Sequence, residues 1–386
     1  MFAAVVPTVA LLLAALPAPA AARQGPDPAA AARLHATWHA GPIAGTIGSS
    51  PTYAGGSVYY TEDAQPATAP GTAVRITRRD AATGARLPFA ADPVATLFLT
   101  RPLAAGGRIL TLSAYERARV KATVRAYTSE GRTAWKRDLP GEKFPTELVA
   151  AGPLVLAAAE TGCDRPGATG CAHTTVTAWS AADGTPAWQR TLAGGSPRLA
   201  SAAGRLAIHL LPPTGTPATG TLHGLDAATG RRLWSRSRVP EGVLATDAAA
   251  VYVAAGRVQA FRATDGKIRF STPPARYTDV TAGRAGIYAA TATRRVVALD
   301  PRGRTRWTSP ARPTGPLTAA TGVLWFQHHP GADTEPTYLA AVDTRTGRRL
   351  RTLEVSKGYS PGAVAVGAGR VFTTAYLTQV RAYAPE

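Results

Sequence analysis

The sequence contains no asparagine and few acidic residues: 24 Asp and Glu stand against 43 Lys and Arg, which gives a formal net charge of +19. Charged residues of both signs make up only 17% of the 386 residues. Few segments place apolar residues at the 3.6-residue spacing of a surface helix, and beyond the N-terminus no apolar stretch is long enough to span a bilayer. With 38 Gly and 32 Pro, which interrupt helices and end strands, the chain is expected to be all-β.

Sequence motifs for common catalytic sites are also missing. There is no His-Glu-x-x-His, no Gly-x-Ser-x-Gly, no Gly-rich phosphate loop and no nucleic-acid-binding motif. His328, His329, Asp333 and Glu335 could together ligate a metal, but neighbouring residues on a strand point to opposite sides, so a polar loop is the simpler interpretation. We therefore predict no catalytic residue, no cofactor-binding residue and no metal site.

Only two cysteines are present, Cys163 and Cys171, separated by a loop rich in Gly and Pro. The N-terminus is apolar from Phe2 to Leu16 and small residues follow, which predicts a signal peptide over residues 1–22, although no Lys or Arg follows Met1. An uncleaved membrane anchor is the alternative. An exported chain favours a Cys163–Cys171 disulfide over two free thiols, and it places the protein outside the cytoplasm. Residues 23–35 are predicted to be a linker.

A short pattern, "DAATGRRLW" in its fullest form, recurs along the chain. A turn glycine returns every 36 to 53 residues, and an aromatic residue follows it by four positions in most copies. The glycines are Gly84, Gly131, Gly184, Gly230, Gly266, Gly303 and Gly347, and the aromatics are Trp135, Trp188, Trp234, Phe270 and Trp307. Pro88 and Arg351 replace the aromatic in two copies, and we expect those copies to dock less tightly.

A second pattern repeats in phase with the first. Short apolar segments precede each turn and occur eight times, and the second position before the Asp is usually Ala or Gly. Four strands in a unit of about 40 residues are typical of a propeller. We predict an eight-bladed β-propeller of four-stranded antiparallel blades over residues 36–386, with the ring closed by an N-terminal strand that carries Trp38. Closure removes exposed sheet edges.

The repeat resembles the PQQ-type β-propeller repeat, which is found in quinoprotein alcohol dehydrogenases and in BamB-like assembly lipoproteins. The matching positions are Asp226, Thr229, Gly230 and Trp234, and the resemblance covers residues 36–386. It implies that Asp226, Thr229 and Gly230 shape a turn, and that Trp38, Trp135, Trp188, Trp234, Phe270 and Trp307 dock neighbouring blades. The dehydrogenases hold a calcium-bound quinone beneath a disulfide of adjacent cysteines, whereas this chain has no adjacent Cys pair, so a non-enzymatic branch is expected and no cofactor is predicted.

Function is expected in the loops that do not repeat. Five long loops join second to third strands and should emerge at one end of the ring: Glu62–Gly71, Ala114–Val120, Glu160–His173, Pro212–Gly220 and His329–Pro336. Their charged residues predict a mixed-charge rim: Glu62, Asp63, Glu116, Arg117, Arg119, Glu160, Asp164, Arg165, Asp333 and Glu335.

The predicted function is that of an exported, monomeric scaffold that binds a protein or an anionic cell-envelope polymer, and not nucleic acid. Any membrane contact would be through an uncleaved N-terminal segment. The basic charge also has a simpler interpretation as a solvated surface of a composition biased towards Arg, Ala, Gly and Pro. A PQQ-dependent dehydrogenase and a ligand-sensing propeller of a signalling system are the alternatives.

Overall fold

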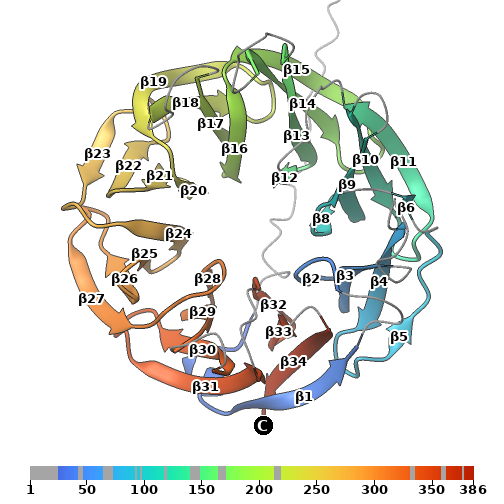
Figure 1. Ribbon diagram of the computed structural model, residues 1–386, viewed down its shortest axis with the longest axis vertical. Helices are drawn as coiled ribbons and strands as arrows, with labels where there is room; N and C mark the ends of the chain where they lie inside the picture. Colours follow the sequence, from blue (N-terminus) through green and yellow to red (C-terminus); the bar gives the residue numbers. More distant parts are fainter. Residues whose placement is uncertain are drawn as a thin grey trace, which may run out of the picture.

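Eight antiparallel sheets stand around a central axis and form a closed ring (Figure 1). The computed structural model describes residues 25–41, 47–63, 73–91, 94–95, 98–116, 120–139, 148–163, 171–212, 219–330, 335–357, 362–375 and 378–386. Within these ranges the regular elements are strands, apart from the four-residue helix α1 (Pro28–Ala31), which is too short to cross a membrane. The predicted all-β, eight-bladed propeller is confirmed.

Each blade runs outward from the axis through four strands in chain order. The first four blades are β2 (Thr52–Ala54), β3 (Ser57–Asp63), β4 (Ala73–Asp80) and β5 (Arg86–Leu87); β8 (Leu103–Ala105), β9 (Arg108–Glu116), β10 (Val120–Tyr127) and β11 (Thr133–Leu139); β12 (Leu148–Ala151), β13 (Leu154–Thr161), β14 (His173–Ser180) and β15 (Pro186–Ala193); and β16 (Gly195–Ala202), β17 (Arg205–Leu211), β18 (Thr219–Asp226) and β19 (Arg232–Pro240). Two short strands, β6 (Val94–Ala95) and β7 (Phe98–Leu99), pair with β4 and β9 respectively.

The remaining blades follow the same order, and the last one combines the two ends of the described chain. They are β20 (Val243–Thr246), β21 (Ala250–Ala254), β22 (Val258–Arg262) and β23 (Ile268–Ser271); β24 (Tyr277–Gly283), β25 (Gly286–Thr291), β26 (Arg295–Leu299) and β27 (Thr305–Pro310); β28 (Thr318–Ala320), β29 (Val323–His328), β30 (Thr337–Asp343) and β31 (Arg349–Ser356); and β32 (Ala365–Gly367), β33 (Arg370–Ala375), β34 (Gln379–Pro385) and β1 (Leu34–Ala40).

Burial along a blade follows from its place between two other blades. Every residue of the second strand β21 is buried, because both faces of the sheet contact a neighbouring blade. The outer strand β23 instead buries Phe270 alone and exposes its other three residues. Strands such as Ala250–Ala254 therefore form continuous apolar runs, whereas outer strands alternate between buried and exposed residues.

The N-terminal strand closes the ring as predicted. β1 pairs antiparallel with β34, with Trp38 opposite Ala382 and Leu34 opposite Pro385. Leu34 and Ala31 are fully buried in a cluster shared with the neighbouring blade, and the Gly25 amide donates to Thr321 Oγ1 at 3.1 Å. The contacts of the ring therefore begin upstream of residue 36, inside the stretch predicted to be a linker.

The two ends of the ring differ in what they carry. The turn joining first and second strands lies beside the turn joining third and fourth strands, as shown by the hydrogen bond from the Ala227 amide to Gly204 O at 2.9 Å and its equivalents in other blades. We call this the turn end. The opposite loop end carries the connections between second and third strands. The predicted loop residues Gly71, Arg117, Arg119, Asp164, Arg165 and Asp333 lie outside the described residues.

Candidate functional site

The recurrent Asp side chain at each turn is hydrogen-bonded within its own turn. Oδ1 of Asp226 accepts from the amides of Ala228 and Thr229 at 3.1 and 2.9 Å, and from the Thr229 hydroxyl at 2.8 Å. Asp80 and Asp343 repeat this arrangement, and these bonds lower the pKa of Asp226. Because equivalent carboxylates lie in separate blades, each shapes one turn.

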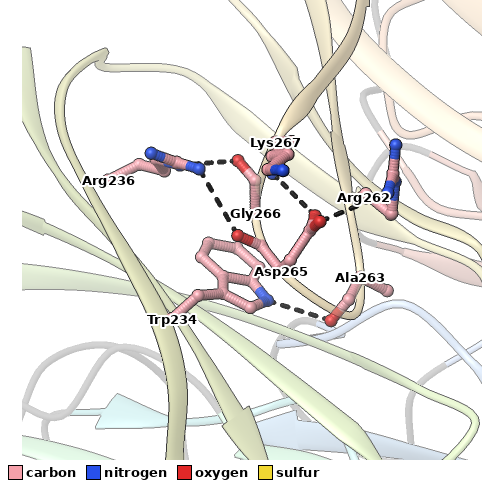
Figure 2. Close-up of polar contacts among 7 residues, drawn as sticks. All are labelled: Trp234, Arg236, Arg262, Ala263, Asp265, Gly266 and Lys267. Atoms are coloured by element: carbon pink, nitrogen blue, oxygen red, sulfur yellow. Dashed lines mark hydrogen bonds and ion pairs between the residues drawn. The ribbon is translucent and has the colours of Figure 1, made fainter.

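The aromatic residue after each turn packs beneath the turn glycine of the next blade. Trp234 Nε1 donates to Ala263 O at 2.9 Å, and its ring lies under Gly266 (Figure 2). The other predicted Trp residues repeat both contacts: Trp38 with Ala81 O and Gly84, Trp135 with Ala181 O and Gly184, Trp188 with Ala227 O and Gly230, and Trp307 with Thr344 O and Gly347. Phe270 packs under Gly303 without a hydrogen bond of this kind. We call this aromatic–glycine contact the docking module.

Within its own blade the aromatic ring covers the small residue that precedes the Asp by two positions. Gly224 pairs with Trp234, and the equivalent alanines pair with their own aromatics. A β-bulge next to this pair recurs in seven of the eight blades. The bulge turns the ring out of its blade and towards the next one.

An arginine two residues after the Trp is a further part of the docking module that the sequence analysis missed. Arg236 Nε donates to Gly266 O at 2.8 Å (Figure 2), and Arg137 and Arg190 donate to Gly184 O and Gly230 O. The signal was visible as Trp-x-Arg in three consecutive copies. The turn carbonyl of one blade is thus capped by a cation from the preceding blade.

The two copies that lack the aromatic are completed by other residues. Next to Pro88, Phe89 packs against Gly131 of the following blade, and it also contacts Tyr59 and Tyr127. Arg351 Nε donates to Leu34 O at 3.1 Å, at the seam where the N-terminal strand replaces an ordinary turn. The two copies without the aromatic, which were expected only to dock less tightly, therefore make other contacts with the next blade.

Substituting Gly266 with alanine should destabilise the protein by about 2 to 3 kcal/mol. The residue has φ of +67°, and an added Cβ would lie 2.5 Å from Trp234 Cε3, so both the backbone and the ring would have to shift. Gly204 provides a control, because it also has positive φ (+74°) but has nothing within 4 Å of an added Cβ. Urea denaturation of both variants separates the two effects, and equal losses would contradict the docking contact.

At the loop end, two of the predicted rim carboxylates are buried. Glu62 lies on β3 opposite Arg75, whose Nε is 3.6 Å from Oε2, and Glu160 on β13 accepts a hydrogen bond from the Ser196 amide. Each is the penultimate residue of the second strand of a blade, and that blade packs between two others, so the prediction that they form an exposed rim was wrong. Beside Glu160, the predicted disulfide joins Cys163 to Cys171.

The His-His segment is buried rather than a polar loop. His328 ends β29 and stacks on Tyr338 with ring centroids 5.5 Å apart, and His329 Nε2 lies 2.8 Å from Glu335 O. No group of three or more His, Cys, Asp or Glu that could hold a metal occurs among the described residues. The His328 imidazole packs inside the blade, and the His329 imidazole packs at its end.

Buried histidines should make the fold sensitive to acid. Burial lowers the pKa of both His223 and His328 to about 4, from 6.5, so the unfolded chain binds more protons between pH 6.5 and 4. The stabilising contribution of these two neutral imidazoles is therefore fully present above pH 6.5. It is lost as the pH falls through this window, by up to about 3 kcal/mol for each imidazole. Denaturation at pH 7.5, 5.5 and 4.5 measures how the free energy of unfolding depends on pH, and His328→Phe should reduce that dependence.

One buried carboxyl acts in the opposite direction. Burial raises the pKa of Asp279 to about 6, so its protonation in the folded state favours folding as the pH falls below 6. Its Oδ2 accepts from the Leu317 amide at 2.7 Å. Asp279→Asn should therefore make stability fall more steeply with decreasing pH than in the wild type. If neither Asp279→Asn nor His328→Phe changed the pH dependence of stability, these pKa assignments would be contradicted.

A cavity of about 790 Å³ lies among the innermost strands. It is lined by the first strands β2, β8, β12, β24, β28 and β32 and by segments that lead into several of them. Its polar groups are chiefly the hydroxyls of Ser49, Ser50, Thr52 and nearby threonines, and Arg101 is the one charged residue among its described lining. Arg101 Nε donates to Thr52 Oγ1 at 3.0 Å, and Thr52 Oγ1 donates to Pro102 O at 2.5 Å.

Comparisons with known proteins agree with this geometry. A family profile described as outer membrane protein assembly factor BamB matches residues 218–383. This match covers less than half of the chain, and in fold the propeller is similar to PQQ-like β-propellers. Quinohemoprotein alcohol dehydrogenase from Comamonas testosteroni superposes with a TM-score of 0.63 at 12% identity, over 93% of this chain and 78% of that one.

Two further solved structures are similar. BamB from Moraxella catarrhalis superposes with a TM-score of 0.56 at 13% identity, over 91% and 99% of the two chains. Sqt1 from Saccharomyces cerevisiae gives 0.56 at 11% identity, over 91% and 97%. No curated protein matches the sequence. At these identities the structures establish the fold of the propeller alone.

The described lining of the axial cavity does not fit a calcium-bound quinone. Calcium takes six to eight oxygen ligands, chiefly carboxylates and carbonyl groups. The side chains of the described lining offer hydroxyls and one guanidinium, but no carboxylate or amide. A cation placed there would meet the positively charged guanidinium of Arg101.

Proposed function

We propose that this chain is an exported, non-catalytic propeller that acts as a binding scaffold for a component of the cell envelope. The observation that carries the proposal is that the recurrent polar residues form hydrogen bonds within the fold. Asp226, Thr229 and their copies hydrogen-bond their own turns, and the Trp–Gly pairs join each blade to the next. The recurrent turn and docking residues therefore maintain the ring, and the side chains that they leave exposed are available for recognition.

Two further features support an extracytoplasmic binding role. The Cys163–Cys171 disulfide is of a kind that persists in oxidising compartments. The formal charge of +19 favours an anionic partner, and cell envelopes are rich in anionic polymers and lipids. The likeness to BamB, whose family profile is described as an outer membrane protein assembly factor, supports a role at the cell envelope.

Co-sedimentation with washed envelope fractions tests the proposal. The full chain and a chain that begins at Gly25 should both bind saturably, because the complete ring lies within residues 25–386. Binding by the full chain alone would assign attachment to the N-terminal segment and would contradict a scaffold role for the propeller. Absence of saturable binding by either chain would also overturn the proposal.

A further inference from the structure

Exposed charge is distributed very unevenly around the ring. In four consecutive blades, the outer strands and the turns that lead into them expose fourteen basic residues and one acidic residue, Glu354. The ranges concerned are 226–240, 262–271, 300–310 and 343–356. The equivalent described ranges 80–88, 128–139 and 180–193 expose three basic residues and three acidic ones. The net charge is therefore concentrated on one side of the ring.

We call these fourteen residues the basic arc. They are Arg231, Arg232, Arg236, Arg238, Arg262, Lys267, Arg269, Arg302, Arg304, Arg306, Arg345, Arg348, Arg349 and Arg351. They belong to β19, β23, β27 and β31 and to the turns before them, and these strands follow one another along the outer wall of the ring (Figure 1). The arc is a continuous convex surface that spans four blades.

The acidic residues within the arc do little to neutralise it. Asp226, Asp300 and Asp343 direct Oδ1 at their own turn amides. Within the described chain, the ion pairs of the arc are Arg262–Asp265 and Arg304–Asp300. Arg236 binds turn carbonyls of the next blade through Nε and Nη2, which fixes its guanidinium at the wall and leaves further donors for a ligand (Figure 2).

One residue of the arc is held in a costly backbone conformation. Arg238 has φ of +59°, in the left-handed region that non-glycine residues rarely adopt. It lies at a bulge in β19, where Gly220 pairs with Val239 and Leu222 pairs with Arg236. The bulge turns this arginine outward at the loop-end side of the wall, so the arc extends along the strand as well as around the turns.

The chemistry of the arc favours phosphate over other anions. Thirteen of its fourteen cations are arginines, whose planar fork donates two hydrogen bonds to one oxyanion, and a tetrahedral phosphate accepts such a pair from any side. The aromatic side chains of these blades do not provide a stacking surface for bases, because Trp234 and Phe270 are buried and Trp307 is half-buried. Recognition would therefore be of phosphates and not of bases.

The shape of the arc indicates a flexible linear ligand. A planar membrane could touch the turns of several blades at once, but not the convex wall that carries Arg236, Arg238, Arg306 and Arg349. Among the described residues of the four ranges that carry the arc, Ile268 is the one large apolar side chain that is exposed (58%), which gives little area for insertion into lipid. From charge, chemistry and curvature, we infer that the basic arc binds a linear phosphate-rich polymer that follows the outer wall of blades β16–β31. The inference deepens the proposed scaffold function and rests on it.

Titration with long-chain inorganic polyphosphate tests the inference. An arc variant, Arg232→Gln, Arg269→Gln, Arg302→Gln and Arg348→Gln, removes one cation from each blade, and none of these side chains is used in the docking module. A control variant, Arg78→Gln, Arg86→Gln, Arg132→Gln and Lys136→Gln, removes the same charge from blades outside the arc. Relative to the wild type, the dissociation constant for polyphosphate should rise at least about tenfold for the arc variant and stay within about twofold for the control. For the wild type it should increase steeply with salt concentration.

Several outcomes would overturn the inference. Equal weakening of both variants would mean that net charge alone drives binding. Tripolyphosphate bound as tightly as the long polymer would indicate a local site, and single-stranded DNA bound more tightly per phosphate would indicate base stacking. Anionic vesicles bound in an arc-dependent manner, in place of the polymer, would indicate a membrane surface. If the wild type binds envelope fractions but not polyphosphate, this inference fails while the proposed function stands, and the converse result refutes the proposed function.

Discussion

Replacing Trp234 with alanine is expected to lower the free energy of unfolding by about 3 to 5 kcal/mol. The ring is 8% exposed and lies between Gly224 of its own blade and Gly266 of the next one, so its removal opens a cavity at the contact between blades. It also leaves Ala263 O without its indole donor. Trp234→Phe retains most of the packing and should cost about 1 kcal/mol for the hydrogen bond.

A double-mutant cycle separates the docking contact from general loss of apolar area. Gly266→Ala should be much less harmful in the Trp234→Ala background, because the added Cβ would no longer meet the indole. Ile268→Ala is a matched control on the following strand, since Ile268 is 58% exposed and its truncation should change stability by less than about 0.5 kcal/mol. Additive effects of the Trp and Gly substitutions would refute the docking contact.

Removal of the N-terminal strand should have the largest effect of any change considered. A chain that begins at Gly41 loses β1, including the buried Leu34 and the Trp38 contact with Gly84, and each of these side chains is worth about 2 to 5 kcal/mol. The edge of β34 would then be exposed and available for pairing with another chain. We expect the melting temperature to fall by at least about 10 °C and the protein to self-associate.

The control for ring opening is the chain that begins at Gly25, which retains α1 and β1 and should melt as the full chain does. Light scattering during the melt distinguishes a weakened monomer from aggregation through β34. Equal melting temperatures for the chains beginning at Gly25 and at Gly41 would show that β1 does not close the ring.

The repeat made most of the fold predictable from sequence. Seven turn glycines and eight apolar segments in phase specified the number of blades, and Trp38 ahead of the first blade indicated closure by an N-terminal strand. The reason is physical: each blade must bury both faces against equivalent neighbours, so the same residue types return at the same positions. The pairing of Trp234 with the Ala263 carbonyl and Gly266 is one case of a contact made by five Trp residues.

Burial at the blade ends was less predictable. Glu62 and Glu160 look like loop residues because they are charged and precede long insertions, yet their strands continue far enough to bury them. Whether such a carboxylate is buried depends on a cross-strand partner such as Arg75, which local sequence does not reveal. The basic arc was hidden for a similar reason: its arginines are scattered over 120 residues of sequence, and only the ring brings them to one side.

Calorimetric titration of the purified protein with PQQ in the presence of calcium tests the central claim most directly, because it asks whether the propeller is a scaffold or a quinoprotein. The described residues of the cavity lining include no carboxylate of the kind that calcium prefers, so we predict no saturable heat and no dye-linked oxidation of alcohols. One-to-one, saturable uptake of PQQ accompanied by alcohol oxidation would contradict the account.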